Sequence, residues 1–140
     1  MNRHSILLIA AGALLLGGWQ LYERSAGQNT GQDLEAFMQR KLDYSKFILE
    51  GLATENYEKI ADNAGKLASL SLESTWNTIN TEEYLTQSRE FRRAAQRMAA
   101  AAREKNVDRA TLGFVDVTVR CVECHSYLRK RLKPADPAQP

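Results

Sequence analysis

The chain has 140 residues and a formal net charge of +2, and this length is that of one ordinary domain. All three prolines fall at or after position 134, and only ten valines and isoleucines stand against eighteen alanines. This composition disfavours strands and favours helices, so an all-α fold is expected. The small net charge argues against the strongly basic surface of a nucleic-acid-binding protein, and no nucleic-acid partner is expected.

The first residues have the layout of an export signal. A short basic start, residues 1–4, precedes residues 6–19, which carry no charged or strongly polar side chain. Counted over residues 5–22, the apolar span has eighteen residues, just below the roughly 20 that cross the hydrocarbon core of a bilayer. We therefore expect the chain to leave the cytoplasm, which predicts a periplasmic location.

Two fates of this segment remain open. Ser25, Ala26 and Gly27 are small residues of the kind found at a cleavage site. Trp19 and Tyr22, in contrast, are typical of the aromatic belt of a membrane anchor that stays uncut, and they slightly favour that alternative. In either case residues 1–27 precede the folded domain, as a signal peptide or as an inner-membrane anchor with a tether.

The first two helices of the domain are expected after this segment. Thr30 and Asp33 approximate a capping box, and the helix runs to about residues 51–53. Thr54 is the predicted N-cap of a second helix, which ends near Ser71. The inward face predicted for the first helix comprises Leu34, Met38, Leu42, Ser45, Leu49 and Leu52. That of the second comprises Tyr57, Ile60, Ala64, Leu67 and Ser71.

A longer crossover, residues 72–80, is predicted next, with Trp76 packed over an end of the bundle. Thr81 then caps a third helix that runs to about Lys105. Its seam comprises Tyr84, Ser88, Phe91, Ala95, Met98 and Ala102. Because alanine is small for a core position, the alanines at 95, 99 and 102 are expected to leave volume for a porphyrin.

A fourth helix begins at Asn106 or Asp108, and Pro134 prevents its continuation. Its seam comprises Ala110, Phe114, Val117, Cys121, Cys124 and Leu128. Four helices with two short turns and one crossover predict an antiparallel up-down-up-down four-helix bundle over residues 30–133. Residues 134–140 are expected to be a disordered tail.

The only two cysteines lie in the sequence Cys121-Val122-Glu123-Cys124-His125, the C-x-x-C-H pattern of covalent haem attachment. On a helix the positions i, i+3 and i+4 share one face. Two thiols can therefore bond to the two vinyl groups of one haem, while the imidazole of His125 reaches the iron from the same side. One motif predicts one haem c.

Two other uses of the cysteine pair fit the sequence less well. A disulfide or a thioredoxin-like redox pair has no role for the adjacent histidine, and the chain lacks a βαβ pattern. A zinc site needs four ligands, but the only other histidine is His4 in the export segment, and no third cysteine exists. The haem interpretation is favoured.

A haem motif near the C-terminus, on the last helix of a four-helix bundle, resembles the class II c-type cytochromes, the cytochrome c-prime and c-556 group. The resemblance covers about residues 30–133 and includes Arg129, four residues after the motif histidine, which implies that Arg129 binds the cofactor. One departure is Leu128, where that group usually has an aromatic residue, with Tyr127 just before it.

The resemblance implies a function. It indicates a non-enzymatic protein that carries single electrons between redox partners outside the cytoplasm. The five-coordinate members of the same group imply the alternative, a protein that binds or senses NO or CO. Whether two copies pair through the first two helices is left open.

Met38 is the predicted second axial ligand of the iron, opposite His125. The opening of the first helix, residues 33–38, looks like that of the b-type four-helix-bundle cytochrome, where an early methionine completes the coordination. Met38 and His125 each lie about 9 Å from the matching ends of two antiparallel helices, so their depths agree. The alternative is a vacant distal side covered by Leu34.

Overall fold

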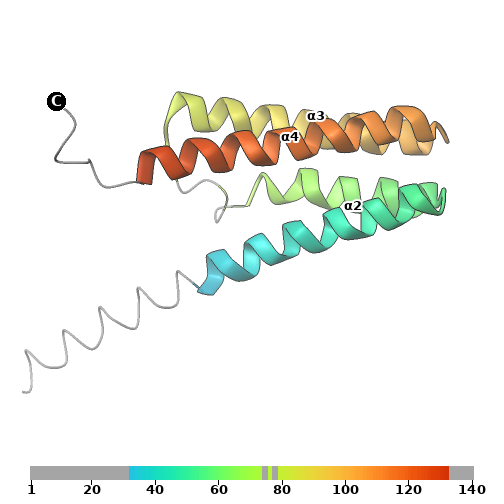
Figure 1. Cartoon of the computed structure of the whole chain (residues 1–140), viewed down its shortest axis with the longest axis horizontal. Coiled ribbons are helices and arrows are strands. Elements are labelled where there is room, and N and C mark those ends of the chain that lie inside the picture. Colours follow the sequence, from blue (N-terminus) through green and yellow to red (C-terminus); the bar gives the residue numbers. More distant parts are fainter. Residues whose placement is uncertain (1–31, 74–75, 77–78, 133–140) are drawn as a thin grey trace, which may run out of the picture. The chain divides into compact units, whose positions relative to one another are not determined.

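The structure is a computed structural model that describes residues 32–73, 76 and 79–132. A helix over residues 32–53 is followed by α2 (Tyr57–Leu70), α3 (Glu82–Arg103) and α4 (Val107–Leu132), and no strand occurs in these ranges (Figure 1). The prediction of an all-helical, four-helix fold is confirmed. The expected export segment and C-terminal tail lie outside the described residues.

The chain divides into two compact units, Met1–Met38 and Gln39–Pro140. All packing that follows concerns the second unit, which holds the greater part of the first helix and all of α2, α3 and α4. None of the helices in the described part of the chain is both long and apolar enough to cross a membrane.

Side-chain caps begin the last three helices. The side-chain oxygens of Asn56, Thr81 and Asn106 each accept a hydrogen bond from the backbone N–H three residues later. The predicted cap at Thr81 is confirmed, and of the two predicted starts of the last helix, Asn106 and Asp108, Asn106 is the cap. The cap predicted at Thr54 is wrong, because its hydroxyl donates to the carbonyl of Glu50 at 2.8 Å and so closes the end of the first helix. The chain turns once more before Asn56 starts α2.

Contacts between α3 and α4 define an antiparallel pair. Thr81 at the start of α3 hydrogen-bonds Tyr127 near the end of α4 at 2.8 Å. Further along, Arg97 pairs with Asp116 at 2.8 Å. Position 113 of α4 lies against Met98. Residue numbers on the two helices thus change in opposite directions, which is the arrangement that the short turn between them requires.

The other neighbouring helices are also antiparallel. Lys59 of α2 pairs with Glu50 at 2.6 Å, and Arg40 pairs with Glu73, beyond the far end of α2, at 2.9 Å. Arg92 of α3 donates to the hydroxyl of Ser71 at 2.9 Å, across from the end of α2. Each helix of the unit therefore runs opposite to the one before it in the chain.

The predicted inward face of α3 is confirmed, and so is that of α2 except at Tyr57, which is half-buried. Ile60, Ala64 and Leu67 of α2 are fully buried. All six predicted seam positions of α3 are buried too: Tyr84, Ser88, Phe91, Ala95, Met98 and Ala102. On α4 the buried positions include Ala110 and Val117, while Phe114, Cys121, Cys124 and Leu128 are half-buried.

The inward face predicted for the first helix is wrong. Leu42 and Leu49 are 52% and 56% exposed, whereas Ile48 is fully buried. A Cβ added to Gly51 would lie 2.9 Å from the side chain of Ile60 on α2, so Gly51 allows a close approach of the two backbones. Because of this approach, the face that contains Ile48 and Gly51 lies against α2. Leu42 and Leu49, on the adjacent face, point outward.

Trp76, in the crossover between α2 and α3, is buried. Its indole Nε1 donates to the hydroxyl of Ser88 at 2.7 Å, and its ring centroid lies 5.0 Å from that of Phe91. The hydroxyl of Tyr84 donates to the backbone carbonyl of Trp76. The indole is thus held by α3 on more than one side, and the prediction that Trp76, Tyr84 and Phe91 are core residues is confirmed.

Candidate cofactor site

The C-x-x-C-H motif lies inside α4, and its last residue, His125, is seven residues before the end of the helix. Cys121 and Cys124 are free thiols, and both are half-buried, while His125 is more exposed. Because the helix continues through the motif, the three side chains project from one side over little more than one turn. The structure therefore brings together the three motif residues that the sequence predicted.

Burial controls the acidity of the two thiols. It raises the pKa of Cys121 and of Cys124 above the usual thiol range, because a thiolate is less well solvated there than in water. The ammonium of Lys41 acts in the opposite direction and lowers both pKa values. The thiols are therefore kept mainly protonated at neutral pH, next to a positive charge.

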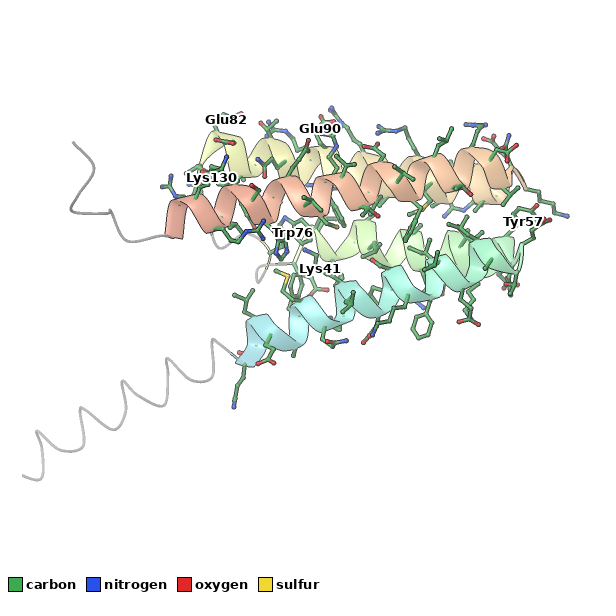
Figure 2. The ribbon with its side chains drawn as sticks, viewed as in Figure 1. Lys41, Tyr57, Trp76, Glu82, Glu90 and Lys130 are labelled. Carbon is green, nitrogen blue, oxygen red and sulfur yellow. The ribbon has the colours of Figure 1, made fainter. Side chains whose placement is uncertain are left out.

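Lys41 is a site residue that the sequence analysis missed. It is half-buried and lies next to Trp76 (Figure 2). Its Nζ is 3.9 Å from the ring centroid of Trp76 and 5.6 Å from that of Phe91. Burial lowers the pKa of Lys41, and the nearby Cys121 and Cys124 partly offset this effect. Within the described ranges no carboxylate lies within ion-pair distance of its ammonium.

A signal for Lys41 was present in the sequence. It lies at helical spacing from Tyr44 and Ile48, on the face that turns inward, and a lysine among such residues indicates a buried charge. It was missed because the leucines of the neighbouring face indicate a different inward side of the helix.

His125 lies in a positive environment. Burial lowers its pKa first, and the charges of Lys41 and Arg129 lower it further. The imidazole is therefore neutral at neutral pH, the form that binds metals. Arg129 itself is exposed, one turn after the histidine, so the structure places it on the same side of α4 as the motif.

The turn of α4 that carries the end of the motif, the motif turn, is joined to α3 by a hydrogen bond. The hydroxyls of Tyr127 and Thr81 share a hydrogen bond of 2.8 Å, and Thr81 is also the N-cap of α3. This contact ties the residue two positions after His125 to a fixed helix end. In the sequence Tyr127 stood out only as a departure from the pattern of the resembling family.

Gln87 on α3 carries a buried Oε1 with no hydrogen-bond partner among the residues that the structure describes. The α3–α4 register of Thr81 with Tyr127 and Met98 with position 113 places Gln87 level with the motif turn. An unsatisfied buried amide oxygen costs on the order of 1–3 kcal/mol.

The small alanines of α3 do not lie beside the motif. Met98, in the middle of the alanine run, is opposite Gly113, eight residues before Cys121. At 1.5 Å per residue this is about 12 Å along the helix from the nearer thiol. Ala95, Ala99 and Ala102 are buried in the close contact between helices, and the expectation that they make room for a porphyrin is not supported.

Met38 is half-buried and Leu34 is 40% exposed, and both belong to the unit Met1–Met38. His125 belongs to the other unit. Coordination of the iron by Met38 therefore stays a prediction.

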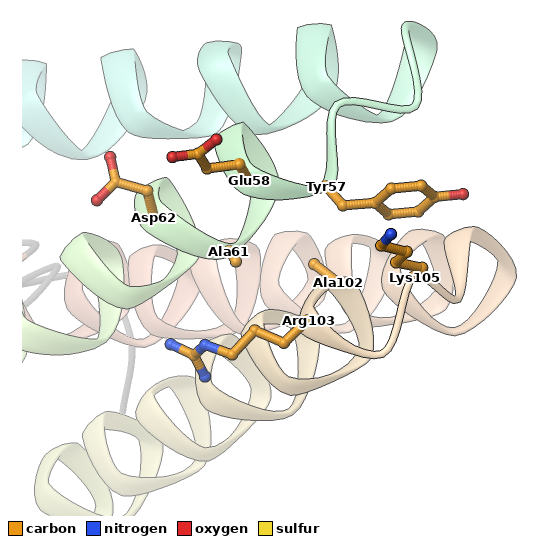
Figure 3. Close-up of a pocket in the computed structure, with 7 residues that line it drawn as sticks. All are labelled: Tyr57, Glu58, Ala61, Asp62, Ala102, Arg103 and Lys105. Atoms are coloured by element: carbon orange, nitrogen blue, oxygen red, sulfur yellow. The ribbon is translucent and has the colours of Figure 1, made fainter.

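A hollow of about 440 Å³ lies at the other end of the bundle (Figure 3). It is lined by Glu58 and Asp62 of α2, by Arg103 at the end of α3 and by Lys105 in the turn that follows. None of the motif residues lines it, and its side chains form a mixed-charge surface without a cysteine or a histidine. It does not compete with the motif as a candidate site.

Comparison of the chain with protein-family models, with curated proteins and with solved structures finds no match. Over the described ranges, no group of three or more His, Cys, Asp and Glu side chains is arranged to hold a metal ion.

Proposed function

We propose that this chain is a monohaem c-type cytochrome of the four-helix-bundle class, which carries single electrons between redox proteins outside the cytoplasm. One observation carries the proposal: Cys121, Cys124 and His125 lie on one side of the last helix, with both thiols free and half-buried. The proposed class is that of the cytochrome c-prime and c-556 group, and the proposed role is not enzymatic.

The donor set fits a covalently bound haem. Each thiol would add its S–H across a vinyl double bond, so that sulfur bonds to one carbon and hydrogen to the other with no net oxidation. Free, protonated thiols at Cys121 and Cys124 support this addition. The neutral imidazole of His125 supports axial coordination. When bound, the haem would supply the one-electron redox chemistry.

The charges around the motif suit an anionic cofactor. Lys41 on the inner side and Arg129 on the outer side both act on His125. A guanidinium at the exposed edge of the site can hold a carboxylate in two parallel hydrogen bonds. We therefore assign Arg129 the role of binding a haem propionate.

The proposed setting follows from the N-terminus. Residues 1–27 would direct the chain to the periplasm, as a cleaved signal or as an inner-membrane anchor. The partners would be other redox proteins, which the domain would meet while anchored to the membrane or after release by cleavage.

Covalent attachment is the direct test. The chain is expressed in a bacterial host that attaches haem to exported proteins, and the coloured protein is extracted with acid acetone. Because thioether bonds are covalent, the colour is expected to stay with the wild-type protein. The double variant Cys121→Ala, Cys124→Ala is expected to lose it.

A matched control is Val122→Ala, which changes a side chain between the two cysteines that is 60% exposed. It is expected to keep the covalent haem. A wild-type protein that is colourless, or whose colour is extracted completely, would show the proposal to be wrong.

A further inference from the structure

We propose that Lys41 sets the reduction potential of the bound haem, by holding a positive charge beside the attachment motif that favours the reduced form. This inference rests on the proposed function. It assigns Lys41 the role of a positioning residue that acts on the cofactor through its charge, without bonding to the iron.

The placement of Lys41 depends on three separate segments of the chain. It lies on the helix over residues 32–53, stacks at 3.9 Å on the ring of Trp76 from the crossover, and comes within 5.6 Å of the ring of Phe91 on α3. An ammonium above an indole face is attracted by the ring quadrupole, by about 0.5–2 kcal/mol depending on burial. The aromatic pair therefore keeps the charge inside the bundle.

Trp76 is itself fixed. Its Nε1 donates to the hydroxyl of Ser88 at 2.7 Å, and its backbone carbonyl accepts from Tyr84. Ser88 in turn donates to the backbone carbonyl of Tyr84 at 2.9 Å, so its hydroxyl is oriented to accept the indole proton. The indole of Trp76, on which Lys41 stacks, is packed against α3 and cannot turn away without breaking these hydrogen bonds.

The charge of Lys41 acts on all three motif residues. It lowers the pKa values of Cys121, Cys124 and His125. In the described part of the chain no carboxylate forms an ion pair with its ammonium, so its field is not cancelled locally. A cofactor joined to the two cysteines would therefore lie within this field.

The expected effect follows from Coulomb's law. Oxidised haem carries one more positive charge than reduced haem, so a nearby ammonium disfavours the oxidised form, most strongly where water is excluded. Loss of the charge is expected to shift the ratio of oxidised to reduced protein by about tenfold or more at a fixed potential. For a one-electron couple, tenfold corresponds to about 59 mV.

The test compares Lys41→Gln with the wild type, both carrying covalent haem, by spectroelectrochemical titration at neutral pH. The midpoint potential of Lys41→Gln is expected to fall by the amount given above, and that of Lys41→Arg to stay near the wild-type value. Lys46→Gln is the matched control, because it removes one charge from the same helix at a side chain that is 61% exposed. It is expected to shift the ratio less than twofold.

A double-mutant cycle tests whether Trp76 acts through Lys41. Trp76→Leu removes the platform and releases the ammonium toward solvent, so the potential is expected to fall. In the Lys41→Gln background the same substitution is expected to have a much smaller effect. Equal effects of Trp76→Leu in both backgrounds would overturn the inference.

Three further results would overturn it as well. The first is a midpoint potential of Lys41→Gln equal to that of the Lys46→Gln control. The second is a change of haem spin state in Lys41→Gln, which would identify the lysine as a ligand. The third applies if Lys41→Gln fails to bind haem, and it is an unchanged midpoint potential in Trp76→Leu. Failure of the wild type to bind haem covalently would instead reject the proposed function.

Discussion

Gly113 of α4 lies directly against Met98 of α3. A Cβ added at position 113 would meet the Cβ of Met98 at 2.8 Å and its Cα at 3.1 Å. These atoms belong to, or are attached directly to, the backbone of a buried helix, so they cannot move aside as the end of a flexible side chain could. The closest approach of α3 and α4 thus depends on the absence of a side chain at this position.

Gly113→Ala is expected to destabilise the bundle by about 1–3 kcal/mol, because the two helices must separate to accept the methyl group. Gly65→Ala in α2 is the matched control, since nothing lies within 4 Å of its added Cβ. That variant is expected to gain about 0.5–1 kcal/mol from the better helix propensity of alanine. Urea unfolding followed by circular dichroism measures both, and equal shifts in the two variants would contradict the packing described.

Ile48→Ala and Leu49→Ala test the orientation of the first helix. Ile48 is fully buried and Leu49 is 56% exposed. The free energy of unfolding is expected to fall by about 2–5 kcal/mol for Ile48→Ala, because a cavity is left, and to change by no more than about 0.5 kcal/mol for Leu49→Ala. The reverse order would restore the face predicted from the sequence.

The thiols of the haem-free protein are expected to react slowly with iodoacetamide. Because burial raises the pKa of Cys121 and Cys124, less thiolate is present at a given pH than in the urea-unfolded chain. The rate is expected to rise only at a pH above the usual thiol range. Lys41→Gln removes the charge that lowers both pKa values, so its rate profile is expected to move to still higher pH. A profile that moves to lower pH would contradict the placement of Lys41.

Met38→Leu tests the second axial ligand in the holoprotein. If the thioether of Met38 binds the iron, the substitution is expected to convert a six-coordinate, low-spin spectrum into a high-spin one and to speed the binding of CO to the reduced protein. Leu34→Ala serves as the control and is expected to leave the spectrum unchanged. A wild-type spectrum that is already high-spin and is unaltered in Met38→Leu would favour the alternative function, the binding of small gases.

The helices and most of their caps could be predicted from the sequence. Thr81 and Asn106 are caps because a short side chain can accept from a backbone N–H three residues on, which is a local relationship. The seam of α3 was predicted for a similar reason, since only one face of that segment is apolar. The prediction of a cap at Thr54 was wrong because Thr54 and Asn56 are both suitable N-cap residues. The turn between the two helices places Asn56, and not Thr54, at the start of α2.

The sequence by itself determined the spacing of Cys121, Cys124 and His125 on one side of a helix, because that spacing is a property of the helix alone. Only the tertiary structure decided what surrounds them. The first helix carries two overlapping stripes of apolar residues, and periodicity cannot choose between them; the close approach at Gly51 does. That choice turns Lys41 inward, onto Trp76 and beside the two thiols, where side chains from distant parts of the chain meet.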